Sequence, residues 1–232
     1  MRQEIDPKDS KRAEAYNLWM KSPLPMVTLT KTFDITRIYR ISKRKGIKLN
    51  MLLCWCIGKA ASQIEEFYTL PEKEKLIKYD TLAINVIVNN VKGGINSCDI
   101  PYTHDIEQFN ADYTTLTKKT STECKSIFNE EHMIVGTSAM VATELDSVIN
   151  QYTELFCNPM VMWGKYRKDW FKKSSLSRSS STMYRWTVAT PQISCRNYRK
   201  RSIDYKSLNT TFNLRFSSPL SKEEGAAFGG GD

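Results

Sequence analysis

The spacing of hydrophobic and polar residues before residue 173 predicts a regular mixture of strands and helices. Four apolar or alternating runs are expected to be strands, and two segments with helical periodicity are expected to be helices. The strands lie at about 25–33, 81–88, 132–139 and 159–166, and the helices at about 49–65 and 106–119. Because the two kinds of element interleave along the chain, the pattern favours an α/β fold with layers around one sheet.

The segment after the first predicted strand carries signals for both ends of another helix. Asp34 can accept hydrogen bonds from the unpaired N–H groups of a first helical turn, and Gly46 suits the helix exit. The helix that follows, NMLLCWCIGKAASQIEEF, has apolar residues on more than one face. We therefore expect it to be buried.

The regular pattern stops near residue 173. Ser, Arg and Lys dominate the stretch SSSTMYRWTVATPQISCRNYRKRSID. No repeat or linker divides residues 1–172, and a chain of 232 residues with 41% hydrophobic residues is long enough to bury a core. We expect one domain over residues 1–172 and a basic, disordered tail over residues 173–232.

The net charge of +9 is concentrated in the same region. Residues 165–204 contain eleven Lys and Arg against two Asp, a net of +9, so the rest of the chain is balanced. Trp186, Tyr184 and Tyr198 stand among the arginines of this tail and could stack on bases while the cations meet phosphates. A nucleic-acid-binding protein with a basic tail is therefore one alternative.

Composition argues against several other classes of protein. The chain has no run of about 18 apolar residues, and its amino terminus, MRQEIDPKDSKRAEAY, lacks the layout of a signal peptide. We expect a cytoplasmic protein without a membrane span. Its six cysteines form no C-x-x-C pair and it has two histidines, so we expect reduced thiols and no metal site.

The ordered part of the chain carries a series of motifs in one order. They are FDIT after the first strand, the helix ending QIEEFY, and then KLIKYDTLAINVIV, SCDIPYTHDIEQFNADY, TSA and PMVMWGKY, spanning nearly all of residues 10–168. Each motif is weak alone, but the ordered set resembles the chloramphenicol acetyltransferase family. The resemblance implies a two-layer sandwich of a mixed β-sheet with helices, with the last strand and helix missing or altered here.

The resemblance also implies an activity and an assembly. Members of this family transfer an acetyl group from acetyl-CoA to a hydroxyl of chloramphenicol, an antibiotic resistance function, and form homotrimers with sites between subunits. For this chain we expect acetyl-CoA as co-substrate, chloramphenicol or a similar hydroxylated compound as acceptor, and no metal.

Five positions are candidates for functional roles. By resemblance, the hydroxyl of Ser138 supports the oxyanion, and Arg12 orients the aspartate of a motif that follows. Trp19 stands where the family has a tyrosine that faces the acceptor, and Val27 stands where an aromatic residue is usual. Lys165 could meet a phosphate of the coenzyme as a point charge.

The family's most specific signature, HHxxxDG, is missing from the chain. Its second histidine is the base that removes the acceptor's proton, and imidazole suits this role because its unperturbed pKa of about 6.5 lies near neutrality. His104 and His132 lack the surrounding motif. We expect both to be ordinary surface or turn histidines.

A shifted reading frame would hide this signature. When the third base of one codon is read with the first two of the next, Met183 with Tyr184 gives only valine, and Trp186 with Thr187 gives only aspartate. The shifted codon that overlaps Thr182 and Met183 permits histidine, as does the codon before it. One consistent reading of the region is LPVQFHHVQMDGGHAADFLQELQKEID, followed by a stop.

We therefore expect a frameshift near residues 168–176 that removes the catalytic histidine and leaves the chain as written inactive or nearly so. A non-catalytic decoy or binding subunit is an alternative. The family commonly has Pro-Trp shortly after Ser138, whereas this chain has Val141 and Ala142. This departure predicts an altered acceptor pocket.

Overall fold

The computed structural model describes residues 2–10, 13–23, 27–72, 75–149, 158–169 and 183–192. Its main sheet has the strand order β2 (Val27–Asp34), β10 (Met183–Gln192), β8 (Met160–Gly164), β7 (Met133–Met140), β5 (Leu82–Asn89) and β6 (Ile95–Pro101), and β9 (Arg167–Asp169) pairs with β10. Strands β5, β7 and β8 run parallel, and the other pairs are antiparallel. A small second sheet holds β1 (Arg2–Ile5), β4 (Lys75–Tyr79) and β3 (Thr69–Glu72).

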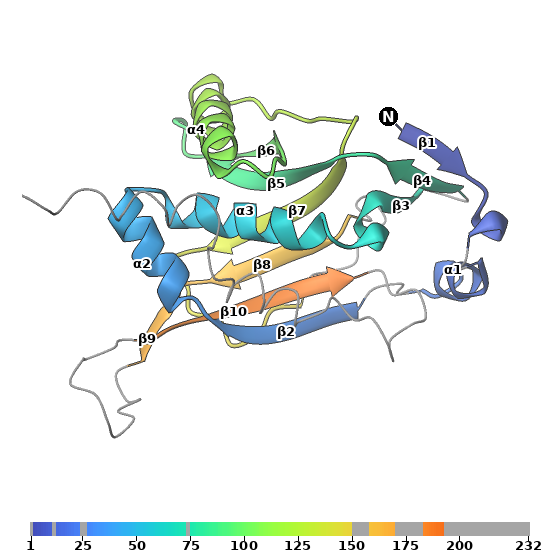
Figure 1. Cartoon of the computed structure of the whole chain (residues 1–232), viewed down its shortest axis with the longest axis horizontal. Coiled ribbons are helices and arrows are strands. Elements are labelled where there is room, and N and C mark those ends of the chain that lie inside the picture. The colour runs from blue at the N-terminus through green and yellow to red at the C-terminus, as the bar shows by residue number, and fades with distance from the viewer. Residues whose placement is uncertain are drawn as a thin grey trace, which may run out of the picture.

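The later α-helices form a layer on the main sheet, whereas the first lies to one side, near the small sheet (Figure 1). The α-helices are α1 (Ala13–Met20), α2 (Thr36–Lys45), α3 (Leu49–Ala61) and α4 (Ile106–Glu123), and the 3₁₀ helices are η1 (Pro7–Asp9) and η2 (Glu65–Tyr68). Helix α3 contacts β5 and β7, and α4 contacts β5 and β6. The predicted two-layer α/β sandwich with a mixed sheet is therefore confirmed.

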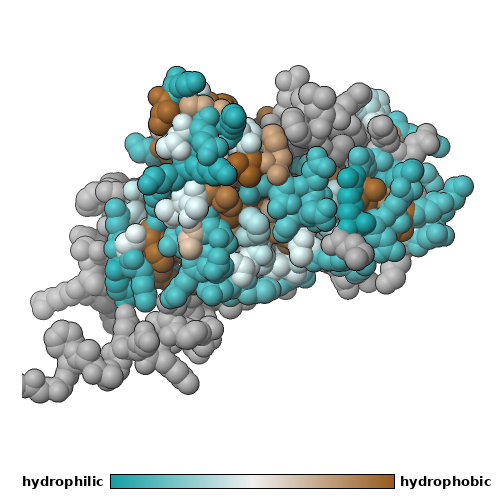
Figure 2. Space-filling model, turned by 90° about the horizontal axis from the view of Figure 1, so that it is seen from above, coloured by the Kyte–Doolittle hydropathy of each residue, from teal (hydrophilic) through white to brown (hydrophobic). Residues whose placement is uncertain are grey.

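Helix α3 is the centre of the hydrophobic core, as its apolar sequence predicts. Ten of its residues are buried, among them Leu52, Leu53 and Trp55. They pack against Ile84 of β5 and Val135 of β7. The face seen in Figure 2 is mostly hydrophilic, with hydrophobic residues in small separate groups, as expected for helices whose apolar sides are turned toward the sheet.

The predicted C-terminal end of α2 is confirmed, whereas its N-cap is Ile35, which makes no side-chain cap hydrogen bond, instead of the predicted Asp34. A carboxylate oxygen of Asp34 accepts a hydrogen bond from the backbone N–H of Thr36 at 2.8 Å. Gly46 has φ +65°, in the left-handed region that favours glycine, and closes the helix through its N–H to the carbonyl of Ser42. The chain therefore turns sharply, and α3 begins three residues later.

Other predicted bounds shift by a few residues. Helix α3 ends at Ala61, where 3₁₀-type hydrogen bonds follow, and α4 continues to Glu123 instead of ending near residue 119. Strand β10 lies beyond residue 172, so ten residues of the predicted tail belong to the main sheet. The domain boundary itself stays a prediction. Within the described ranges, no helix is both long and apolar enough to cross a membrane.

Candidate functional site

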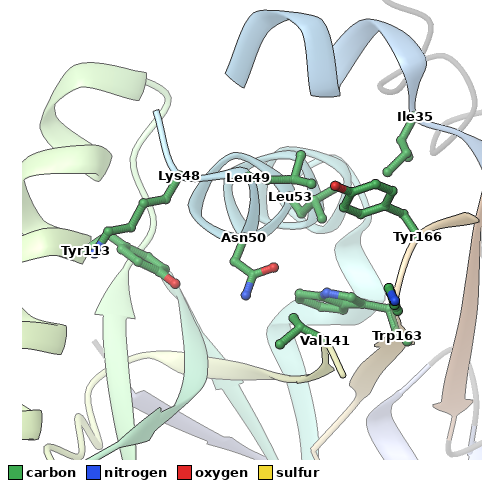
Figure 3. Close-up of a pocket in the computed structure, with 11 residues that line it drawn as sticks. Ile35, Lys48, Leu49, Asn50, Leu53, Tyr113, Val141, Trp163 and Tyr166 are labelled. Atoms are coloured by element: carbon green, nitrogen blue, oxygen red, sulfur yellow. The ribbon is translucent and has the colours of Figure 1, made fainter. Parts of the chain in front are cut away.

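A cleft of about 400 Å³ lies where the start of α3 meets the end of β8 (Figure 3). Its walls are mainly apolar, and its polar groups are two lysines, an asparagine and two tyrosines. The lining residues are Ile35, Lys48, Leu49, Asn50, Leu53, Tyr113, Val141, Trp163, Gly164, Lys165 and Tyr166. None of these residues is acidic. An apolar cleft with a few polar groups is typical of a small-molecule site.

The start of α3 is exposed to this cleft without a side-chain cap. Lys48 occupies the N-cap position in an extended conformation, and its side chain has no acceptor for the first backbone N–H groups of the helix. These N–H groups carry the positive end of the helix dipole. Because Lys48, Leu49 and Asn50 all line the cleft, the helix end adds a positive potential there.

Two lysines strengthen this positive potential. Lys48 and Lys165 both line the cleft with exposed side chains. Neither forms an ion pair with another residue in the part of the chain that the structure describes. Two free ammonium groups beside an uncapped helix start are suited to bind phosphate groups.

Aromatic and amide side chains complete the polar part of the cleft. Tyr113 of α4 is 9% exposed, and burial raises the pKa of its phenol. Figure 3 shows the Asn50 side chain projecting into the opening between Tyr113 and Trp163. The ring of Tyr166 packs against the ring of Tyr39 in α2, with ring centroids 5.3 Å apart.

The loop after β7 forms one wall of the cleft through Val141. The carbonyl of Thr143 in this loop accepts a 2.7 Å hydrogen bond from the backbone N–H of Lys165, just after β8. Arg167 bridges two acidic residues of the same loop, Glu144 at 3.2 Å and Asp146 at 2.8 Å. The loop is therefore attached to the end of β8, on the rim of the cleft.

Lys165 lies in the cleft, but Ser138 faces the opposite side of the sheet. Thr137 of β7 contacts Cys54 of α3, with 3.7 Å between oxygen and sulfur. Successive side chains of a strand point to opposite faces, so the neighbouring Ser138 points away from α3. Within one chain the structure does not bring Ser138 and Lys165 into one cleft.

The other matched positions lie elsewhere or outside the described residues. Val27 is the first residue of β2 and pairs with Gln192 of β10. Trp19 belongs to α1, where only its backbone is described, and Arg12 lies outside the described residues. Of the two positions under the shifted histidine codon, Thr182 is not described and Met183 begins β10. The predicted roles of all these residues stay predictions.

Neither histidine lines the cleft. His104 is exposed in the loop before α4 and contacts the hydroxyl of Tyr102 at 3.2 Å. His132 lies just before β7, with its Nδ1 2.9 Å from the side-chain oxygen of Asn129, and burial lowers its pKa. Each histidine is engaged locally and is absent from the cleft.

Sequence reasoning missed Lys48, Asn50 and Tyr113. The position of Lys48 could have been found, because a predicted helix exit at Gly46 and a helix start near residue 49 leave it at the turn between two helices. Tyr113 gave no such signal, because a tyrosine in an amphipathic helix is usually part of the core. Val141 was noted only as a departure from a motif.

Comparison with known proteins identifies similar sequences and folds. The family model described as chloramphenicol acetyltransferase matches residues 2–173. A solved chloramphenicol acetyltransferase superimposes with a TM-score of 0.71 and 16% identity, covering 91% of this chain and 100% of that chain. A search of curated protein sequences gave no match.

Two acyltransferase structures of another kind also share the fold. A probable dihydrolipoamide acetyltransferase from Listeria monocytogenes matches with a TM-score of 0.63 and 9% identity, covering 91% of this chain and 96% of that chain. A dihydrolipoamide acetyltransferase from Azotobacter vinelandii matches with a TM-score of 0.60 and 12% identity, covering 87% and 86%. At these identities the similarity shows the fold alone.

Proposed function

Because this chain belongs to the chloramphenicol acetyltransferase family, we propose that it descends from an enzyme that moved acetyl from acetyl-CoA to a hydroxyl of chloramphenicol or a similar compound. The observation that carries this proposal is a cationic cleft built entirely from residues inside the matched region. We propose further that the chain as written has lost most or all of this activity.

The cleft residues fit a CoA thioester. CoA carries several phosphate charges on its nucleotide and a long, mostly neutral arm that ends in the thiol. Lys48, Lys165 and the N–H groups at the start of α3 supply cations and donors for the phosphates. Leu49, Leu53 and Val141 supply apolar surface for the neutral arm. This assigns Lys165 the phosphate contact predicted from the sequence and adds Lys48 to it.

The transfer step requires three functions from the protein. The acceptor oxygen forms a bond to the thioester carbon, its proton goes to a base, and the C–S bond breaks to release the thiol of CoA. A donor must also stabilise the oxyanion of the tetrahedral intermediate. Ser138 is the candidate donor, and its hydroxyl forms no hydrogen bond within the described residues.

The base is the function that the chain lacks. His104 and His132 are the two histidines of the sequence, and both lie outside the cleft. Neither histidine stands in HHxxxDG, so the acceptor proton has no imidazole at the motif position to accept it, and loss of a general base alone lowers the rate by a factor of roughly 10² to 10⁴. Arg12 would likewise have no aspartate to orient.

Ser138 supports a site that is shared between subunits. It faces the side of the main sheet opposite α3, whereas the cleft is built at the start of α3. A reacting centre that uses both needs a second surface against the face of Ser138. We propose a homotrimer, as the family resemblance implies, with Trp19 and Val27 near the acceptor.

The family match also supports the frameshift. It ends at residue 173, within a few residues of the predicted shift at 168–176 and before the codons that permit HHxxxDG. A change of reading frame at this point would leave the matched region intact and replace the signature and the sequence of the strand and helix around it, although residues 183–192 of the chain as written still pair in the main sheet as β10.

The test compares the chain as written with a version whose reading frame is corrected by one base before the codon of Leu176. Release of free CoA thiol is followed with acetyl-CoA and chloramphenicol, and with other hydroxylated compounds in parallel. We expect turnover by the corrected version and none, or less than about one part in 10², by the chain as written. Enzyme-like turnover by the chain as written would refute the loss of activity, and light scattering of both proteins tests the trimer.

A further inference from the structure

We propose that Asn50 and Tyr113 form a hydrogen-bonding pair in the cleft that binds a neutral amide-like group of the CoA co-substrate. This inference rests on the proposed function, and it adds recognition of a neutral part of the ligand to the phosphate contacts of the lysines. The two residues come from different helices, α3 and α4.

Tyr113 has a polar group that α4 itself does not satisfy. Its side chain is 9% exposed and packs beside Phe109, with ring centroids 6.5 Å apart. Its hydroxyl forms no hydrogen bond to any other described residue, yet the residue lines the cleft. The hydroxyl oxygen itself is not fully buried, because it reaches the cleft, where water or a ligand can bond it; phenylalanine would fill the same space without offering this donor. The hydroxyl is therefore placed where a ligand can satisfy it.

The protonation state of this phenol suits a donor. Burial, together with the nearby thiols of Cys54 and Cys98, raises the pKa of Tyr113 above its ordinary value. The group therefore keeps its proton throughout the physiological range, and it can both donate and accept one hydrogen bond with a neutral partner.

Asn50 presents a second unsatisfied polar group to the same opening. It is the second residue of α3, and its carboxamide makes no hydrogen bond with another described residue. An asparagine in the first turn of a helix is usually hydrated, but here the side chain projects into the cleft between Tyr113 and Trp163 (Figure 3). A carboxamide offers donors and an acceptor side by side.

The combined chemistry matches a group with adjacent donor and acceptor atoms. CoA has two sources of such a group, the secondary amides of its pantetheine arm and the edge of its adenine ring, which asparagine can pair with through two hydrogen bonds. The phosphates are matched by the cations Lys48 and Lys165 of the same cleft, which leaves this neutral pair for a neutral group.

The test uses the full chain with Tyr113→Phe and Asn50→Leu, and Tyr68→Phe as the control. The phenylalanine variant removes one oxygen and keeps the ring, whereas Tyr68 donates to the carbonyl of Ser62 outside the cleft. Calorimetry measures the dissociation constants of CoA, 3′,5′-ADP and pantetheine. We expect each cleft variant to raise the dissociation constant of CoA by roughly 2- to 12-fold, as the loss of one hydrogen bond predicts. Tyr68→Phe should leave this constant unchanged.

The two fragments distinguish the sources of the neutral group. Weaker binding of 3′,5′-ADP assigns the pair to the adenine edge, and weaker binding of pantetheine assigns it to an amide of the arm; either result supports the inference. Unchanged CoA affinity in Tyr113→Phe overturns the inference alone, whatever the folding of Asn50→Leu. If the unaltered chain binds neither CoA nor a fragment, the proposed function fails together with the inference.

Discussion

Replacing Gly164 with alanine would force a carbon atom into the contact between β8 and the loop after β7. The new Cβ would lie 2.7 Å from Cγ of Leu145 and 2.7 Å from the carbonyl oxygen of Thr143. The carbonyl is backbone, and it is also the acceptor of the 2.7 Å hydrogen bond from the N–H of Lys165. The loop must therefore move away from the strand and loosen that bond.

The expected cost follows from these two effects. Overpacking at a tight contact destabilises by about 1–3 kcal/mol, and a weakened backbone hydrogen bond adds about 1 kcal/mol. The ion pairs of Arg167 with Glu144 and Asp146 do not hold the loop against this force, because all three side chains are at least 45% exposed and such pairs contribute little. We expect a loss of about 2–4 kcal/mol in the free energy of unfolding.

Urea denaturation followed by tryptophan fluorescence measures this loss. Gly136→Ala is the matched control, because Gly136 is also a buried strand residue and its new Cβ would lie 3.4 Å from the flexible end of Met160. We expect the control to stay within about 1 kcal/mol of the unaltered chain. A Gly164→Ala variant as stable as the control would refute the tight contact and the loop position inferred from it.

Three further predictions concern charge and burial. Lys48→Ala and Lys165→Ala should each weaken the binding of CoA roughly tenfold. Added salt should weaken CoA binding most in the unaltered chain, because salt screens the contacts between lysine and phosphate. Calorimetry at two salt concentrations checks both expectations, and equal salt dependence in all three proteins would contradict the phosphate contact. Burial raises the pKa of Cys54 to about 12. This thiol should therefore react with iodoacetamide at pH 8 at least about 100-fold more slowly than the half-buried Cys124. Peptide mass spectrometry measures both rates, and similar labelling of the two thiols would show that α3 opens readily. Burial lowers the pKa of His132 in the folded state. The folded chain therefore binds fewer protons than the unfolded chain and loses stability as the pH falls below about 6.5. Urea denaturation at pH 7.5 and 5.5 should show a smaller loss of stability for His132→Gln than for the unaltered chain, and an equal loss would rule out this histidine as the cause.

Local patterns predicted the elements that depend on local chemistry. Asp34 and Gly46 mark the ends of α2 because N–H satisfaction and a left-handed backbone are properties of single residues. The apolar runs of β5, β7 and β8 were found because strands buried on the sheet need continuous hydrophobic residues.

Elements with weak local signals were missed. Strand β6, with the sequence INSCDIP, lacks clear alternation and is held by its pairing with β5 and by backbone bonds to Ile127. Strand β10, MYRWTVATPQ, lies inside the Ser- and Arg-rich stretch that was predicted to be a tail, and its place in the main sheet depends on partners in β2 and β8 that lie far away in the chain. Propensity carries little information about such long-range pairing.

The sequence by itself determined the family resemblance, the missing HHxxxDG and the codons that permit it, because these depend only on the order of residues. Only the tertiary structure decided that Lys48, Asn50, Tyr113 and Lys165 share one cleft. They come from the turn before α3, from α3, from α4 and from the end of β8, and contacts between such distant segments are set by how the helices pack on the sheet. The same geometry separates Ser138 from that cleft, because alternation along β7 turns neighbouring side chains to opposite faces.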